Sequence, residues 1–425
     1  MRPGRPLRVE GVARRVAVAG FAGLLLFLPW GIAGQQISLA LAWAALLFVP
    51  SWRSRSIDPF RPSHGGRLLV TGLLLWVGAS LLSLLLSGEA ASGIGELRKL
   101  PLLSALALPA GIGGGEEGRR RAALLLLLSA GVAALFGIVE QIQGAGGHLT
   151  RLDGPIGFYM TTAGIFLLVS LLSLSFVMRR KLLGGLVPPL FLLVTAGLLL
   201  TYTRGAWVAW AAGAGILILR RRKSGLLGLL LFVAAILLHP GLRERLFSMG
   251  DLSLPFNRQR LLIWREGVRL FLEHPLFGVG LHDLAGLLEE AGVPAGDAPP
   301  THFHSTYLQT AVATGAAGLA GLLLFLAGLA RELLRAARRA SRPFDRVIAE
   351  GALAAFAGFT VHGLFEWNIG DSEVVTAFCM ITGLGLAVGN QMMSKRTPAV
   401  ISGSCSPATT ARRSASSSAN RSASR

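Results

Sequence analysis

The stretch HSTYLQTAVATGAAGLAGLLLFLAGLA, residues 304–330, decides the fold class of this chain. After its first histidine it contains no ionisable side chain that is charged at neutral pH, and it exceeds the roughly 20 apolar residues that a helix needs to cross a bilayer. Apolar segments of comparable length recur along the 425 residues, of which 52% are hydrophobic and 15% charged, with a mean hydropathy of +0.59. The sequence therefore predicts an all-α integral membrane protein.

Twelve segments of the chain are apolar enough to be predicted as transmembrane helices. A long polar stretch, about residues 240–303, separates the ninth from the tenth and is predicted to be one large periplasmic loop. The predicted spans are about 16–34, 36–51, 68–87, 97–113, 122–142, 155–178, 182–201, 205–219, 225–239, 304–330, 346–366 and 372–392.

The distribution of basic residues gives the orientation. If the N-terminus is cytoplasmic, the inner connections carry 31 of the 41 Lys and Arg residues, whereas 15 of the 22 acidic residues fall on the outer side. Cytoplasmic segments of membrane proteins are enriched in Lys and Arg, so both termini are predicted to be cytoplasmic. The net charge of +19 then reflects topology and contact with anionic membrane lipids, and no nucleic-acid partner is predicted.

The domain organisation follows from the same reading. Residues 1–392 are predicted to form one polytopic membrane domain. The segment 393–425 is rich in Ser, Ala and Arg, and it is predicted to be a disordered cytoplasmic tail.

The large loop contains an amphipathic segment in which one arginine is unusual. On a helical wheel of residues 258–273, Arg260 projects from the apolar side, beside Trp264 and Phe271. A guanidinium on a buried face needs an anionic partner or hydrogen bonds, and its planar fork suits a phosphate as one such partner. The opposite arc is predicted to be solvated and holds Arg258, Gln259, Arg265, Glu266, Arg269 and Glu273.

Two histidines, His302 and His304, lie where the loop enters the next span. His304, Tyr307 and Leu308 share one helical face, and a neutral imidazole there would serve as a general base for a hydroxyl. A capping or merely interfacial histidine is the alternative. Two histidines at this spacing would supply half of the ligands of a zinc site. The spacing is not a metal-binding signature, however, and no carboxylates are clustered with the pair in the sequence, so no metal is predicted.

Further candidates fall on the predicted outer side. Arg204 lies in the turn between two spans, where an arginine at a helix end is an equally good explanation. Arg151 would add positive charge to a site, and Glu366, one turn after His362, would orient a base or an acceptor. For both residues a structural role at the membrane boundary is an equally good explanation. Three arginines and a histidine on one side suggest an anionic, phosphate-bearing substrate such as a lipid-linked pyrophosphate.

Three local patterns resemble the O-antigen ligase family, the Wzy_C type of polytopic membrane glycosyltransferase. They are TYTRGAW at 201–207, RLLIWREGVRLFLEHPLFGVG at 260–280 and HSTYLQTAVATGAAGLAGLLLFL at 304–326. Their order and spacing agree with the family over about residues 120–390. The chain departs from the pattern at Ser305, where the family usually has Asn, and in the additional His302.

The resemblance implies a cofactor-free, metal-independent, inverting glycosyl transfer at the periplasmic face of the bacterial inner membrane. The donor would be a glycan on undecaprenyl pyrophosphate, and the acceptor a hydroxyl of lipid A–core or another glycan. Carried over by motif, Arg204 and Arg260 would hold the pyrophosphate and His304 would be the base. The predicted substrate-binding residues are Arg151, Trp264, His302, Tyr307 and Glu366.

Other functions stay open at this point. A repeat-unit polymerase or a protein O-oligosaccharyltransferase would use the same motifs. A transporter or flippase of lipid-linked substrates is an alternative from another class, but it would place ionisable groups near the bilayer midplane. The midplane of the predicted spans is nearly free of charge, which favours an enzyme.

Overall fold

The computed structural model describes residues 5–57, 60, 64–87, 93, 95, 97–144, 151–179, 183–220, 222–281, 285–293 and 301–394. Within these residues the chain forms helices and no strand, which confirms the all-α prediction. The predicted disordered tail lies, from residue 395 onward, outside the described residues.

The first half of the chain forms helices that correspond to the first seven predicted spans. They are α1 (Arg5–Phe27), α2 (Ile32–Leu46), α3 (Pro50–Ile57), α4 (His64–Leu86), the 3-10 helix η2 (Leu100–Ala107), α6 (Leu108–Gly111), α7 (Glu116–Gly144), α8 (Tyr159–Val177) and α9 (Val187–Leu200).

The second half contains the predicted loop and the spans on either side of it. Its elements are α10 (Arg204–Arg220), α11 (Arg222–Leu238), α12 (Pro240–Phe247), η3 (Ser248–Gly250), α13 (Pro255–Glu273), α14 (Ala285–Glu290), α15 (Thr306–Arg339), α16 (Pro343–His362) and α17 (Ser372–Ser394).

Fewer helices than twelve have the length and composition of a membrane span. Among the described residues, α4, α7, α8, α15 and α17 qualify, which makes five. The number rises to seven if two bent pairs, α2 with α3 and α11 with α12, each count as one span. Residues 97–113 and 182–201 form only short apolar helices, so the twelve-span topology is not confirmed and stays a prediction.

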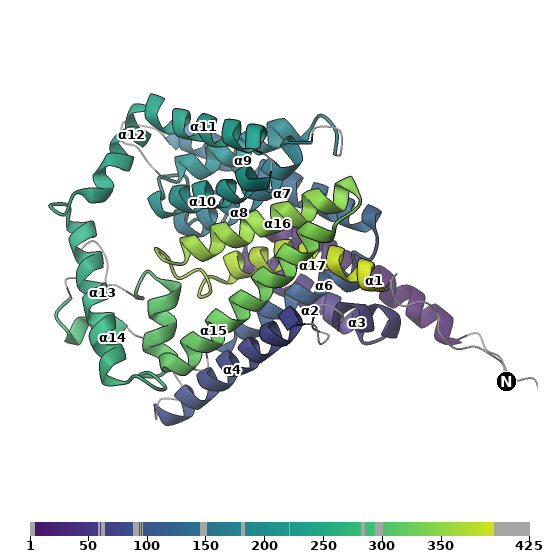
Figure 1. Cartoon of the computed structure of the whole chain (residues 1–425), viewed down its shortest axis with the longest axis horizontal. Coiled ribbons are helices and arrows are strands. Elements are labelled where there is room, and N and C mark those ends of the chain that lie inside the picture. The colour runs from purple at the N-terminus through teal and green to yellow at the C-terminus, as the bar shows by residue number, and fades with distance from the viewer. Residues whose placement is uncertain are drawn as a thin grey trace, which may run out of the picture.

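The core of the bundle lies around α8 and α16. Almost every residue of α8 is buried, and it packs against α9, α10 and α16. Figure 1 shows α16 and α17 in the middle of the molecule, with α7 to α11 on one side and α4 and α15 on the other. The two helices α4 and α15 run side by side at close range. Their backbones can approach because Gly321 faces the backbone of Trp76 and Gly328 that of Leu69.

Helix α15 is broken at Gly315, whose φ of 65° and ψ of −167° are not helical. The break frees backbone groups that the segment 275–280 satisfies: Val279 N–H donates to Val312 O (2.9 Å), and Ala316 N–H donates to Pro275 O (2.8 Å). A side chain at position 315 would collide with the backbone of Leu276. The motif PLFGVG therefore holds a short first part of α15 at an angle to the long second part.

Helices α12, α13 and α14 stand together at one side of the bundle, at the left of Figure 1 and away from the N-terminus. Helix α13 packs onto the start of α15 through a small hydrophobic cluster that is separate from the main core. Gly267 is the point of closest approach, against the ring of Phe303. The buried members of this cluster are Ile263, Leu270, Leu288, Phe303 and Val312.

The helical wheel of α13 places Arg260 correctly on the inward-facing side of the helix. It does not show how much of the apolar side is buried. Arg260 lies i, i+3, i+7 and i+10 with the buried Ile263, Gly267 and Leu270. By contrast, Leu261, Val268 and Leu272 are 46%, 49% and 69% exposed. The apolar arc of α13 is wider than the contact with α15, and only the part that includes Arg260 turns inward.

Candidate active site

The site is built where the start of α15, the turn after α16 and the inward face of α13 meet. The turn between α16 and α17 grips the first residue of α15: Thr306 N–H donates to Gly363 O (2.7 Å) and Thr306 Oγ1 donates to Glu366 O (2.9 Å). Asn368 N–H donates in return to Thr306 Oγ1 (3.1 Å). These backbone contacts set Glu366 directly beside the histidines that precede α15.

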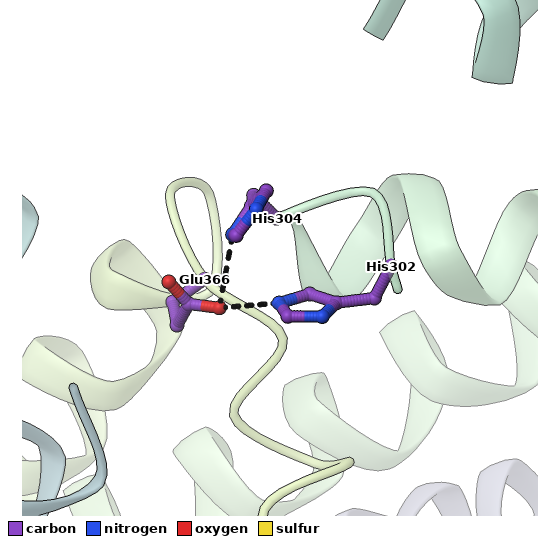
Figure 2. A group of neighbouring side chains, drawn as sticks. All are labelled: His302, His304 and Glu366. Atoms are coloured by element: carbon purple, nitrogen blue, oxygen red, sulfur yellow. Dashed lines mark hydrogen bonds and ion pairs between the residues drawn. The ribbon is translucent and has the colours of Figure 1, made fainter. Parts of the chain in front are cut away.

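The carboxylate of Glu366 is the centre of the cluster. Its Oε1 lies 2.9 Å from His302 Nε2 and 3.4 Å from His304 Nδ1. Figure 2 shows that both imidazoles approach the same oxygen, from different directions. The other oxygen, Oε2, lies 4.0 Å from Arg260 Nη2. One carboxylate thus connects three groups that lie 62 to 106 residues before it in sequence.

The charges of Glu366 and Arg260 depend on each other. Burial would raise the pKa of Glu366, but a hydrogen bond with His302 and charge interactions with His302 and His304 outweigh it and hold that pKa well below its ordinary value. Burial lowers the pKa of Arg260, and the nearby charge of Glu366 opposes this effect. Glu366 is therefore ionised, and Arg260 remains a cation at neutral pH.

His304 has the geometry and protonation state of a base. Burial, as the main cause, lowers its pKa from 6.5, while Glu366 acts in the opposite direction. Glu366 next to Nδ1 favours the tautomer that carries its proton there, which leaves Nε2 with a lone pair. The 3.4 Å approach of Glu366 to Nδ1 is an ion-pair contact, and no hydrogen bond joins Nδ1 to any described residue.

The backbone of His304 is strained. It has a φ of 47°, and the only other described non-glycine residue with a positive φ is Tyr202, at 53°, in the turn before Arg204. A left-handed conformation costs such residues about 1–3 kcal/mol, and strain of this kind collects at functional sites. Both strained residues lie within motifs that the sequence singled out.

His302 is engaged at both ring nitrogens, because its Nδ1 also lies 3.0 Å from Thr301 Oγ1. It is well placed to hold Glu366. No carboxylate lies near the two histidines in the sequence, but the fold brings Glu366 next to them. Possible metal-ligand atoms of His302, His304 and Glu366 all lie within 4.8 Å of one another. Donors of this type suit a zinc ion. The guanidinium of Arg260 next to them would repel one.

Arg204 lies on the neighbouring side, at the first residue of α10. Its Nη1 donates to Ser248 Oγ (3.0 Å) and its Nη2 donates to Asn257 Oδ1 (2.9 Å). These two hydrogen bonds tie α10 to η3 and α13. The charges of Arg151, Arg245 and Arg260 are near enough to act on Arg204, so four arginines share this end of the molecule.

Two predicted residues have mainly structural contacts. Trp264 Nε1 donates to Phe303 O (3.0 Å) and fixes the segment that carries both histidines. The hydroxyl of Tyr307 donates to Thr360 O (2.7 Å), so it holds α15 against α16. Their roles in substrate binding stay predictions.

Sequence reasoning missed two cations near the site. Lys99, before η2, has its Nζ 4.4 Å from the ring centre of Trp367, which itself packs against His302. Arg245 lies on α12, a short and strongly polar helix where an arginine is ordinarily solvated, so the local sequence does not indicate a site there. Its position beside Phe256 at 4.9 Å depends on the fold of the loop.

Residues 189–323 match the Wzy_C family, described as O-antigen ligase. This segment, about a third of the chain, is similar to the O-antigen ligase family. This confirms the family that the three motifs predicted, and the matched segment of the ligase domain includes Arg204, Arg245, Arg260, His302 and His304. No protein among the curated sequences matches the chain.

Proposed function

We propose that this protein transfers a glycan from undecaprenyl pyrophosphate to a hydroxyl of lipid A–core, at the periplasmic face of the bacterial inner membrane. The observation that carries the proposal is the Glu366 cluster. It supplies a neutral imidazole, a carboxylate that orients it, and an arginine within one small volume. These groups suit the activation of a hydroxyl beside an anionic donor.

In the proposed step the acceptor hydroxyl gives its proton to His304 Nε2. Its oxygen attacks the anomeric carbon of the donor sugar while the bond from that carbon to the pyrophosphate oxygen breaks, and the electron pair leaves with the pyrophosphate. A single displacement of this kind inverts the anomeric configuration. Glu366 stabilises the imidazolium that forms, as a carboxylate does in other histidine dyads.

The departing pyrophosphate gains negative charge as the bond breaks. Arg260, which lies beside Glu366 and is 33% exposed, would stabilise this charge. Arg204 would contribute through its field and by holding α13 in place. No metal is required in this scheme, because the arginines carry out the charge stabilisation that a divalent cation would otherwise provide.

The test uses the purified full-length protein with undecaprenyl-pyrophosphate glycan and a choice of acceptors. Product on lipid A–core supports the proposal. Elongated lipid-linked glycan would instead make the protein a polymerase, glycan on a polypeptide would make it a protein oligosaccharyltransferase, and translocation in vesicles without transfer would make it a transporter.

Two controls separate chemistry from folding and from metal dependence. Arg260→Ala and His304→Ala are expected to abolish transfer while the protein is still expressed in the membrane. Transfer is expected to persist in EDTA. Loss of activity in EDTA, restored by added zinc, would replace the metal-free scheme by one in which His302, His304 and Glu366 bind a cation.

A further inference from the structure

A polar cavity lies beside the candidate active site, between the turn before α10, helix α12 and the start of α13. Its volume is about 390 Å³. Two arginines, Arg151 and Arg245, line it from opposite parts of the sequence, together with Tyr202, Glu244, Ser248 and Phe256. The motif-based reasoning assigned no separate site to it.

Among the described residues, no carboxylate neutralises the two arginines of the cavity. Within the described part of the chain, neither Arg151 nor Arg245 forms an ion pair with a carboxylate, and Glu244 on the cavity wall is an exposed side chain. The Nε of Arg245 is buried and has no hydrogen-bond partner. Two half-buried cations that repel each other are costly unless an anion comes between them.

Aromatic rings hold both guanidinium groups in place. Arg151 lies over the ring of Tyr159, at 4.2 Å from its centre. The ring of Phe256 lies 4.9 Å from the guanidinium carbon of Arg204 and equally far from that of Arg245. Cation–π contacts of this kind orient an arginine while leaving its N–H donors free for a ligand.

The two arginines on Phe256 differ in what else they contact. Both Nη atoms of Arg204 are used by Ser248 and Asn257, so this residue joins elements of the protein. Arg245 makes no such side-chain hydrogen bond to a described residue, and its Nε is left without an acceptor. The difference assigns ligand binding to Arg245 and a positioning role to Arg204.

We propose that Arg151 and Arg245 form a second anion subsite, which binds a phosphate group of a substrate next to the reacting centre. The inference rests on the proposed transfer reaction for the identity of the substrate. The charge of Arg245 also acts on that of Arg260, so the subsite and the Glu366 cluster are electrostatic neighbours. The phosphate comes either from the donor pyrophosphate or from a phosphorylated acceptor.

The first experiment measures binding of inorganic pyrophosphate and of inorganic phosphate to the purified full-length protein by calorimetry. Arg151→Gln and Arg245→Gln are each expected to weaken binding about tenfold or more, because each removes a charge-assisted hydrogen bond. Arg245→Lys, which keeps the charge, is expected to lose less. The matched control is Arg243→Gln, an exposed arginine on the same helix, with affinity within about twofold of the wild type.

The second experiment finds the source of the phosphate from the KM values of the Arg245→Gln variant. A higher KM for the lipid-linked donor alone identifies the donor pyrophosphate. A higher KM for a phosphorylated acceptor, with no change for the same acceptor after dephosphorylation, identifies the acceptor. Both KM values unchanged would overturn the subsite.

Failure of the subsite and failure of the proposed function are distinguishable. If no transfer is found but pyrophosphate binding falls in Arg151→Gln and Arg245→Gln, the subsite stands and the reaction is wrong. If a folded Arg245→Gln variant, judged by thermal unfolding and gel filtration, binds both anions as the wild type does, the subsite is wrong whatever the reaction.

Discussion

Asp345 lies in the first turn of α16, Glu366 lies in the turn that follows this helix, and each faces an arginine. The two ion pairs differ in how far their side chains are exposed to solvent. Asp345 Oδ1 lies 2.5 Å from Nη2 of Arg119, a residue with no exposed surface. Glu366 lies 4.0 Å from Arg260, whose side chain is 33% exposed, and it is shared with two histidines. The first pair is closed and holds α7 to α16, whereas the second leaves room for a ligand.

The comparison shows how one helix serves two purposes. At the end near Asp345 the charges satisfy each other, which stabilises a fold once it has formed but offers nothing to a substrate. At the end near Glu366, one carboxylate is contacted by an arginine and two histidines. A surplus of positive charge there is suited to an anionic substrate. The predictions below test this division of roles.

The largest effect is expected at the open end. His304→Ala should lower the rate of glycan transfer by roughly 100- to 10,000-fold, because the hydroxyl loses its base. Initial rates with saturating lipid-linked donor measure this, with thermal unfolding as the check on folding. A folded His304→Ala variant that retains activity would remove the general-base assignment.

At the closed end the expected effect is on stability. Asp345→Asn removes the negative charge that faces the buried Arg119, which should destabilise the fold by about 3–5 kcal/mol. The Tm in detergent should fall, while the transfer rate per folded molecule should stay within about twofold. If instead the Tm is unchanged, contacts between α7 and α16 other than the Arg119–Asp345 pair stabilise this end of α16.

A smaller effect, with a distinctive pH signature, is expected for Glu366→Gln. The neutral form of His304 is the active one, so kcat/KM should fall as the pH drops through the His304 pKa, which burial places below 6.5. Because Glu366 raises that pKa, its neutralisation should move the fall in activity to lower pH. The rate above this pH should drop by about 10- to 100-fold, the loss typical for carboxylates that orient histidine ligands in metal sites.

An acid limb that does not move in Glu366→Gln would contradict this coupling. The role of Glu366 would then be limited to packing. The comparison of the two ends of α16 would in that case distinguish two structural sites and no chemistry.

The smallest effect is expected for Arg265→Ala. Arg265 is exposed on α13, five residues after Arg260 and therefore about 140° around the helix from it. The transfer rate should stay within about twofold of the wild-type rate, and the Tm should change by about a degree, as is usual for substitutions of exposed residues. A large loss of transfer would mean that the outer face of α13 also binds substrate.

Much of the site was readable from local patterns. The position of Arg260 on the inward face of α13 follows from helical periodicity, and His304 lies in a motif that precedes a long apolar helix. Glu366 was proposed as an orienting group because of its place near the outer end of a predicted span, one turn after His362. Local sequence contained no measure of the distance between Glu366 and the histidines, which are 62 or more residues away.

Other features were not readable. The break of α15 at Gly315 arises because the segment 275–280 supplies hydrogen bonds to its backbone, a long-range contact without a local signal. The role of Arg245 was hidden because a polar helix with several arginines is normally solvated. The exposure of Leu261 and Val268 shows the converse, since the wheel cannot tell how much of an apolar arc another element covers.

The sequence by itself determined the all-helical class, the similarity to the O-antigen ligase family and the residue types of the candidate site, because these depend on composition, periodicity and short motifs. Only the tertiary structure decided which charges are paired. Arg119 meets Asp345 and Arg260 meets Glu366 across more than 100 residues, and Arg245 meets no described carboxylate at all. The pairing of a charge depends on distances of a few ångströms, and those are set by the packing of helices that are remote in the chain.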